Sequence, residues 1–281
     1  MSTPTIGITM GDPAGIGPEI VVKGYRELRE TADVLVIGDA EVVESACGIC
    51  GSDLGVERIG SPAEASFERD RIPVLDLDNV ADLERGIVQE AYGTASLEYI
   101  ERAISLAQSG TIDAMVTAPI NKQATELAGS EYAGHTGMLA DYTDTETYSM
   151  MLIEGDLRVT HVSTHVPLRE ARDLVTEREV LETIRVTDEA LRELGVEEPT
   201  VAVAGLNPHA SDGGLLGSED AAEIEPAVSH AREEGIDAFG PESPDTVYVQ
   251  AARGAADCVG VGAEAAPEQR PQQDAAARDH Q

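Results

Sequence analysis

The sequence predicts an α/β protein with a largely parallel sheet. Short apolar segments rich in Val and Ile alternate along the chain with longer amphipathic segments of helical period, which is the pattern of βαβ units. No fixed-period repeat interrupts this alternation. Apolar residues make up 42% of the 281-residue chain, so the sequence can form a packed core in one large domain or two ordinary ones.

The first element is a strand followed by a glycine-rich turn and a helix. Residues 6–10 are expected to form the strand, residues 11–19 (GDPAGIGPE) the turn, and residues 20–29 the helix. Pro18 fits the first helical turn, where its missing N–H leaves no hydrogen bond unmade. The turn lacks the third glycine of a dinucleotide fingerprint and the GK[ST] of a Walker loop. A tight strand-to-helix turn therefore explains it best, with anion binding at the helix start as the alternative.

The later elements continue the alternation. The helix at 93–109 carries Leu97, Ile100 and Ile104 at helical spacing. With two Phe and no Trp in the chain, the core should be aliphatic. The remaining strands are expected at 34–37, 72–75, 112–117, 150–153, 158–163 and 200–204, and the remaining helices at 41–46 and 177–194.

The charge of the chain excludes two classes of partner. With 53 acidic and 19 basic side chains, the formal net charge is −34, which repels nucleic acid and anionic membranes. Lysine is nearly absent, since Lys23 and Lys122 are the two present. This composition is typical of a cytoplasmic protein from a salt-loving organism, and an ordinary acidic protein is the alternative. We expect no membrane span and no secretion signal, and three cysteines suit a reducing cytosol.

Three segments carry candidate site residues. Lys122 ends the segment TAPINK (117–122), directly after a buried strand, where open α/β sheets bind ligands. In a chain with so little lysine, this residue suggests a compact positive charge for an anionic substrate, although a surface lysine is the simpler alternative. His135 and Thr136, in GHT (134–136), precede an expected helix, where they could bind a phosphate or carboxylate. From these residues alone, simple capping by Thr136 is the better explanation.

The histidines after two later strands are candidate metal ligands. His161 and His165 lie four residues apart in a β-branched segment, so they are about 13 Å apart and cannot share one ion. His165, at the strand end, is the better placed. His209 likewise follows the strand at 200–204. Two histidines alone make an incomplete metal site.

Together these segments resemble the 4-hydroxythreonine-4-phosphate dehydrogenase family. The resemblance implies two α/β/α lobes like those of isocitrate and isopropylmalate dehydrogenases, a cleft active site, a homodimer, and NAD as hydride acceptor. The matching segments are ITMGDPAGIGPEI (8–20), TAPINK (117–122), GHT (134–136), STHVPLR (163–169) and GLNPHASDGG (205–214).

The resemblance also implies roles for single residues. His135 and Thr136 match contacts to the substrate phosphate, and His165 and His209 match two of three ligands to a divalent metal (Zn, Mg, Mn or Co). Lys122 is the candidate catalytic residue that holds substrate anions, and no cofactor-binding residue is assigned. The implied reaction is NAD-dependent oxidation and decarboxylation of 4-phosphooxy-threonine in pyridoxal phosphate biosynthesis. Oxidation of threonate or erythronate 4-phosphate is the alternative within the class.

The C-terminal part departs from the family pattern. The family continues with a segment that supplies the third metal histidine and much of the NAD site, and none of it is recognisable here. Residues 251–281 contain no Leu, Ile, Met or Phe, and 10 of the 31 are Ala. We therefore expect a family-like region at 1–250 with two interleaved lobes, followed by a disordered tail at 251–281 from a truncation or frameshift. A non-catalytic remnant is the alternative of another class.

Overall fold

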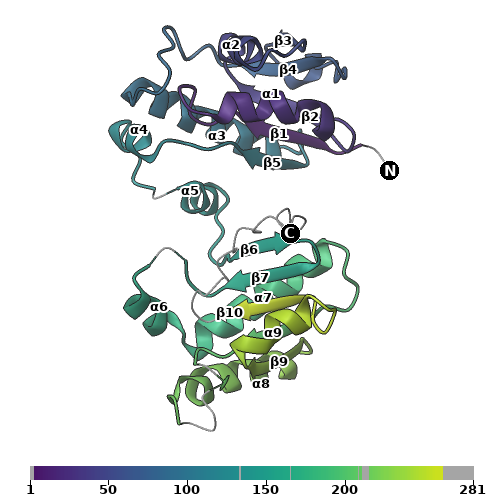
Figure 1. Cartoon of the computed structure of the whole chain (residues 1–281), viewed down its shortest axis with the longest axis vertical. Helices are drawn as coiled ribbons and strands as arrows, with labels where there is room; N and C mark the ends of the chain where they lie inside the picture. Colours follow the sequence, from purple (N-terminus) through teal and green to yellow (C-terminus); the bar gives the residue numbers. More distant parts are fainter. Residues whose placement is uncertain (1–2, 133, 165, 208, 211–214, 262–281) are drawn as a thin grey trace, which may run out of the picture. The chain divides into compact units, whose positions relative to one another are not determined.

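The computed structural model describes residues 3–132, 134–164, 166–207, 209–210 and 215–261 (Figure 1). The chain forms two compact units, Met1–Thr145 and Glu146–Gln281. Each unit is built around a five-stranded sheet of its own. No helix in the described part is long and apolar enough to cross a membrane.

The sheet of the first unit is parallel throughout. Its strand order is β3-β4-β2-β1-β5, so β1 lies between β2 and β5, and β5 is an edge strand. The order places the carboxyl ends of all five strands at one edge, where ligands bind in open α/β sheets. The strands are β1 (Thr5–Thr9), β2 (Asp33–Gly38), β3 (Gly55–Ile59), β4 (Arg71–Asp76) and β5 (Ala114–Thr117).

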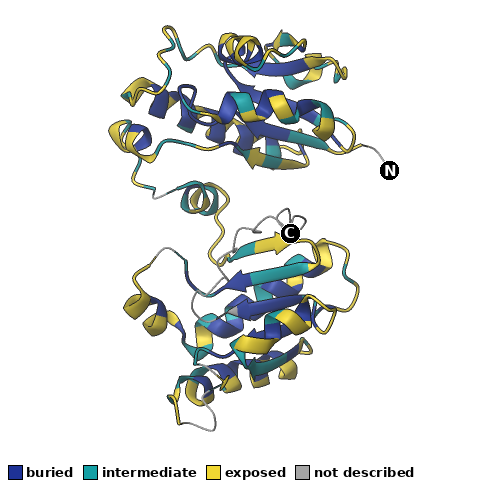
Figure 2. Cartoon of the chain, in the orientation of Figure 1, coloured by how far each residue is buried: buried dark blue, intermediate teal, exposed yellow. Residues whose placement is uncertain are grey.

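Helices follow the strands of the first unit and cover its core. The prediction of an aliphatic core is only partly right, because Tyr25 and Tyr99 are fully buried among the aliphatic side chains. The strand β2 is buried along almost its whole length, as expected for a strand covered on both faces (Figure 2). Helix α1 packs against α2, and α3 packs against β1, β2, β5 and α4. The helices are α1 (Gly17–Leu28), α2 (Ala40–Cys50), α3 (Glu90–Gln108), α4 (Lys122–Leu127) and α5 (His135–Tyr142), with a short 3-10 turn at Pro62–Glu64.

The second unit has a mixed sheet of order β6-β7-β10-β8-β9. The pair β6–β7 is antiparallel, and the remaining pairs are parallel. Its strands are β6 (Met150–Glu154), β7 (Leu157–His161), β8 (Thr200–Ala204), β9 (Asp237–Glu242) and β10 (Cys258–Val261). Its helices are α6 (Leu168–Leu174), α7 (Glu177–Glu193), the π-helical turn η3 (Asp220–Ile224), α8 (Glu225–Glu233) and α9 (Pro244–Ala251).

The prediction of a disordered tail at 251–281 is wrong for the first residues of that range. Residues 258–261 form β10, which pairs with both β7 and β8 in the middle of the second sheet. Asp257 fixes the start of this strand, since its carboxylate accepts a hydrogen bond from Thr200 N (2.9 Å) and its N–H donates to Thr200 O (2.9 Å). A central strand needs small or β-branched residues, so the lack of Leu and Ile does not prevent it from packing. Residues 262–281 lie outside the described part.

Candidate active site

The first candidate site lies at the carboxyl edge of the sheet in the first unit. Strands β1 and β5 are parallel neighbours, with Thr9 opposite Thr117, so the segments that follow them leave the sheet side by side. Ala118 N donates to Thr9 O (3.0 Å), and Asp12 N donates to Pro119 O (3.0 Å). Two motifs that are more than 100 residues apart in sequence, GDPAG and TAPINK, thus meet at one edge.

Glycine is required where the turn contacts its neighbours. Gly11 has a φ of +72°, and a Cβ there would lie 2.3 Å from the carbonyl oxygen of Pro119. A Cβ at Gly17, the first residue of α1, would lie 2.1 Å from the carbonyl oxygen of Met10. Pro18 stands in the first helical turn, as expected from the sequence. The glycines therefore serve backbone packing, which supports the interpretation of this segment as a tight strand-to-helix turn.

Asp12 places a buried carboxylate inside this turn. The side chain is 7% exposed, and its Oδ1 accepts a hydrogen bond from Ala14 N (2.9 Å). Burial raises the pKa of Asp12 from its ordinary value, and the hydrogen bond from Ala14 N and the polar side chain of Asn121 oppose that shift.

Asn121 and Lys122 begin helix α4. Asn121 is the N-cap residue, and its Oδ1 accepts from the backbone N–H groups of Gln123 (3.1 Å) and Ala124 (3.2 Å). Lys122 is the first helical residue, and its side chain is exposed. It forms no ion pair with any carboxylate in the described part of the chain. The structure thus places an available cation just beyond the end of β5, where the sequence predicts it.

His135 and Thr136 form the start of helix α5, which runs for eight residues. The prediction that Thr136 caps this helix is wrong, because the N-cap is Gly134 and no side chain caps it; Thr136 is exposed. The Nε2 atom of His135 is buried and has no hydrogen-bond partner among the described residues. Burial lowers the pKa of His135, and the nearby positive charge of Lys122 lowers it further. His135 and Lys122 therefore lie close enough to interact electrostatically.

Asp39, at the end of β2, is a second buried carboxylate in this unit. In many nucleotide-binding sheets an acid at such a position binds a ribose. Here the Asp39 carboxylate accepts from the backbone N–H groups of Asn79 (2.6 Å) and Val80 (3.0 Å) and from the hydroxyl of Tyr99. Because these three donors already bind it, Asp39 holds a loop in place and is not a candidate for cofactor binding.

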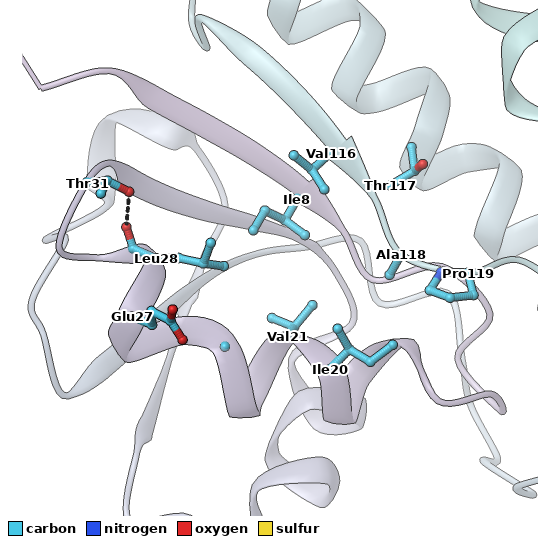
Figure 3. A pocket seen from close by; sticks show the side chains of 11 residues that line it. Ile8, Ile20, Val21, Glu27, Leu28, Thr31, Val116, Thr117, Ala118 and Pro119 are labelled. Carbon is cyan, nitrogen blue, oxygen red and sulfur yellow. Dashed lines mark hydrogen bonds between the residues drawn. The ribbon is translucent and has the colours of Figure 1, made fainter. Parts of the chain in front are cut away.

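An apolar groove of about 550 Å³ lies beside this site, between α1 and β5 (Figure 3). Figure 3 shows Val21 of α1, Ile8 of β1 and Val116 of β5 around the groove, and Pro119 at one end of it. Neither Lys122 nor His135 lines the groove. Its apolar lining does not suit a phosphorylated acid.

The histidines of the second unit are placed separately. His161 is the last residue of β7 and is buried, and neither its Nδ1 nor the Oγ of Ser163 has a hydrogen-bond partner in the described part. Strand β7 ends at His161, short of the expected end at residue 163, so the strand does not test the predicted separation of His161 and His165. His165 itself lies outside the described residues.

His209 lies in the loop after β8 and is exposed. It and Ala210 both have positive φ, +55° and +48°, which non-glycine residues seldom adopt. The buried carboxylate of Asp220 holds this loop by accepting from Leu206 N (2.7 Å) and from the Asn207 side chain (3.4 Å). The Nδ1 atom of His209 is 3.7 Å from Asp245 Oδ2.

Whether these residues fit a metal can be judged from the donors present. An exposed imidazole such as that of His209 is a suitable donor for a divalent transition metal. Among the described residues, no group of three or more His, Cys, Asp or Glu side chains could hold a metal ion. The described residues therefore supply part of a ligand set, and the expected partner, His165, falls outside them.

Comparison with known proteins decides the family. The family model described as pyridoxal phosphate biosynthetic protein PdxA matches residues 30–260. The chain belongs to this family. A Clostridium botulinum relative assigned as a D-threonate 4-phosphate dehydrogenase is 42% identical over 255 residues, which cover 89% of this chain and 76% of the relative.

Solved structures agree with the family assignment. The 4-hydroxythreonine-4-phosphate dehydrogenase of Burkholderia phymatum has 41% identity and a TM-score of 0.86, covering 93% of this chain and 81% of that one. The Klebsiella pneumoniae enzyme of the same name has 40% identity and a TM-score of 0.87, with 92% and 80% covered.

These findings confirm the predicted family, the α/β fold class with parallel sheets and the oxidoreductase class. The chain is a dehydrogenase of the 4-hydroxythreonine-4-phosphate or D-threonate 4-phosphate type. The sequence reasoning missed Asp12, Asn121 and Asp220. The signal for Asp12 and Asn121 was available, because both lie inside motifs that carry the resemblance.

Proposed function

We propose that this chain oxidises a four-carbon phosphorylated hydroxy acid with NAD, and that the substrate phosphate binds at Lys122, His135 and Thr136. One observation carries the proposal. The buried Nε2 of His135 has no partner in the described part, and it lies at the start of α5 near the available cation Lys122. A phosphate oxygen there would fill the unmade hydrogen bond and meet a positive charge.

The electrostatics of this place favour a phosphate. The first N–H groups of α5 have no side-chain cap, and the helix start carries partial positive charge. Elsewhere the chain is strongly acidic, so a site that binds a dianion must concentrate its few cations. Lys122 is one of two lysines in the chain, and it stands at this site.

The reaction follows from the substrate class. The carbinol C–H of the substrate leaves as hydride to NAD⁺ while the hydroxyl loses its proton, which gives a ketone β to the carboxylate. The carboxylate then leaves as carbon dioxide, and the electron pair of the broken C–C bond forms an enolate that is later protonated. When bound, a divalent metal supplies Lewis-acid stabilisation of the negative charge on oxygen. Lys122, His135 and Thr136 hold the phosphate, so that the reacting carbon keeps a fixed position.

The metal and the assembly are further parts of the proposal. We assign His165 and His209 as ligands of a divalent metal such as Zn²⁺, Mn²⁺, Co²⁺ or Mg²⁺, by resemblance to the family. The donor chemistry of the exposed His209 supports this assignment. We also propose that the chain acts as a homodimer in the cytoplasm, and light scattering of the purified chain would give its oligomeric state.

Two substrates compete within the proposal. The solved neighbours are named for 4-hydroxythreonine 4-phosphate, and the Clostridium relative for D-threonate 4-phosphate. The two acids differ in an amino or a hydroxyl group at one carbon. We place 4-phosphooxy-threonine first because the solved structures that match the fold of this chain are named for that substrate.

The test measures NADH formation with each acid, with each divalent metal and in molar KCl. The salt tests the expected halophily, since it screens the self-repulsion of 53 acidic side chains. We expect turnover that EDTA abolishes and carbon dioxide release that matches NADH. Phosphate binding without turnover for either acid would instead support a non-catalytic remnant, and absence of both would refute the proposed site.

A further inference from the structure

Strand β7 places two polar residues, His161 and Ser163, at the carboxyl edge of the second sheet. Strands β7, β10, β8 and β9 run parallel, so their carboxyl ends lie at one edge (Figure 1). In open α/β sheets, ligands bind outside this edge. His161 is the last residue of β7, and Ser163 follows two residues later. Both residues therefore lie where a ligand of this unit is expected.

Both side chains are buried, and each contains a polar atom that makes no hydrogen bond to the described residues. His161 is 5% exposed and Ser163 is 8% exposed, and the atoms concerned are the imidazole Nδ1 and the Ser163 Oγ. In the described part of the second unit, these are the two buried side-chain atoms of this kind. A buried polar group without a hydrogen bond is unfavourable, so two of them within three residues require an explanation.

The preceding residue shows that polar side chains of this strand can be paired within the protein. Thr160 is hydrogen-bonded to Thr187 of α7, with 3.0 Å between the hydroxyl oxygens, and the Thr187 hydroxyl also contacts Thr183 O (2.7 Å). Because side chains alternate along a strand, the His161 ring lies on the face opposite to Thr160. The hydroxyl that faces α7 thus has its partner, whereas His161 and Ser163 have none in the described part of the chain.

The backbone of His161 is held from three sides. The residue lies opposite Met150 of β6 and opposite Val261 of β10, and its carbonyl oxygen accepts from the Ser149 hydroxyl (2.8 Å). A side chain on a strand that is paired on both sides has little freedom to move toward a distant partner. It is instead a preorganised group, which a ligand can meet at small cost in conformational entropy.

The charge of the surrounding segments indicates an anionic ligand. Of the 281 residues 53 are acidic, yet residues 157–169 and 199–211, which contain β7, β8 and the segments after them, have no Asp or Glu, and neither has β10. Asp220 reaches this edge, but its carboxylate already accepts from Leu206 N (2.7 Å). The Ser163 hydroxyl and a protonated Nδ1 are both donors, and hydrogen bonds to a carboxylate are among the strong ones.

We propose that His161 and Ser163 bind the carboxylate of the hydroxy acid substrate, with one hydrogen bond to each carboxylate oxygen. Two residues of extended chain span about 7 Å, so both donors can reach one carboxylate between them. The inference rests on the proposed function for the identity of the acid, whereas the two donors belong to the second unit alone. The pair selects an acid over the corresponding alcohol.

The test compares two small ligands that differ in the carboxylate. Threonate carries the acid without the phosphate, and threitol has the same carbon skeleton without the carboxylate. Calorimetry in EDTA, where no metal contributes, measures both with the wild-type, His161→Leu, Ser163→Ala and Thr187→Val chains. We expect threonate to bind and threitol not to bind, and each change at the pair should weaken threonate binding about tenfold. Thr187→Val, the matched hydroxyl control, should bind threonate like the wild type.

Melting temperatures of the ligand-free chains separate binding from a structural role. Ser163→Ala should leave the melting temperature unchanged or raise it, because the lost hydroxyl makes no hydrogen bond to the described residues. Thr187→Val removes a hydroxyl with two partners and should lower it by about 2–4 °C. Equal lowering by Ser163→Ala would show that this hydroxyl has a structural partner and would overturn the inference.

Failure of this inference and failure of the proposed function give different results. Absence of threonate binding to the wild type, equal binding of threitol, or equal threonate affinity in the wild type, His161→Leu and Ser163→Ala would overturn the carboxylate site. Turnover of the phosphorylated acid in the same chains would then leave the proposed function intact. Weakened threonate binding in both variants, with no turnover of either phosphorylated acid by the wild type, would support the carboxylate site and refute the proposed activity.

Discussion

The two units hold their candidate residues in different ways. In the first, neighbouring parallel strands place two motifs side by side, and backbone contacts at Gly11 and Gly93 fix the segments. In the second, His209 lies in a loop with two consecutive positive-φ residues, and the buried carboxylate of Asp220 holds that loop. The first arrangement depends on close backbone packing, and the second on hydrogen bonds to the side chains of Asp220 and Glu219.

This difference predicts where each unit is sensitive. Close backbone packing tolerates no added atoms, whereas a loop held by a carboxylate depends on its hydrogen bonds. Substitutions that add a methyl group should therefore damage the first unit, and substitutions that remove an acceptor should damage the second.

The largest effect is expected from Gly93→Ala. Glycine-to-alanine changes inside helices usually stabilise, but here the new Cβ would lie 1.9 Å from Ala124 O and push α3 from α4. We expect a loss of about 2–3 kcal/mol in the free energy of unfolding. Gly48→Ala in α2 is the matched control, because no atom lies within 4 Å of its added Cβ, and it should be neutral or stabilising. Urea unfolding measures the free energy of unfolding of both variants. Equal losses would contradict the close contact between α3 and α4 as the cause of the effect.

The next effect concerns the affinity for the substrate. Lys122→Met removes the cation beside His135, and hydrogen bonds to charged groups contribute about 1.5–3 kcal/mol. We expect KM for the phosphorylated substrate to rise about 10- to 100-fold, with a smaller change in kcat. Lys23→Met should leave both constants unchanged. Equal KM values for the two variants would show that the charge of Lys122 does not contribute to substrate binding.

In the second unit, Asp220→Ala tests the loop. The change leaves Leu206 N without its acceptor, and we expect a loss of about 1–3 kcal/mol in stability. Phosphate affinity should not change, because no residue of the proposed phosphate site lies in this unit. The control is Asp156→Ala, at an exposed turn between β6 and β7. A drop in phosphate affinity for Asp220→Ala would contradict the assignment of the phosphate site to the first unit alone.

The smallest effect is on the titration of His135. Its pKa is lowered by burial and by Lys122, so the folded state resists protonation and stability is lost as pH falls through the ordinary histidine range. Removing the charge in Lys122→Met should raise the pKa of His135 and reduce that loss. NMR titration of the ring proton measures the change. An unaltered or lowered pKa would contradict the proximity of the two side chains.

Much of this arrangement could be predicted from the sequence. All the expected strands are present, and Lys122 lies just beyond a strand end as expected, since apolar runs with β-branched residues mark strands. The contact of the GDPAG turn with the TAPINK segment, in which Asp12 N donates to Pro119 O, could not be predicted, because it depends on β1 pairing with β5, and nothing local in either segment specifies that pairing. Strand β10 was missed because four residues with only two Val carry little hydrophobic signal, and the strand is held by its pairing with β7 and β8.

The most direct test of the account is an NMR titration of the wild-type chain with inorganic phosphate, in which the ring signals of His135 and His230 are followed. His230, paired with Glu177 in the second unit, is the internal control. We predict that the His135 signal shifts and saturates with phosphate while that of His230 stays in place. Phosphate binding that leaves the His135 signal unmoved would contradict the assignment of the phosphate site to the first unit.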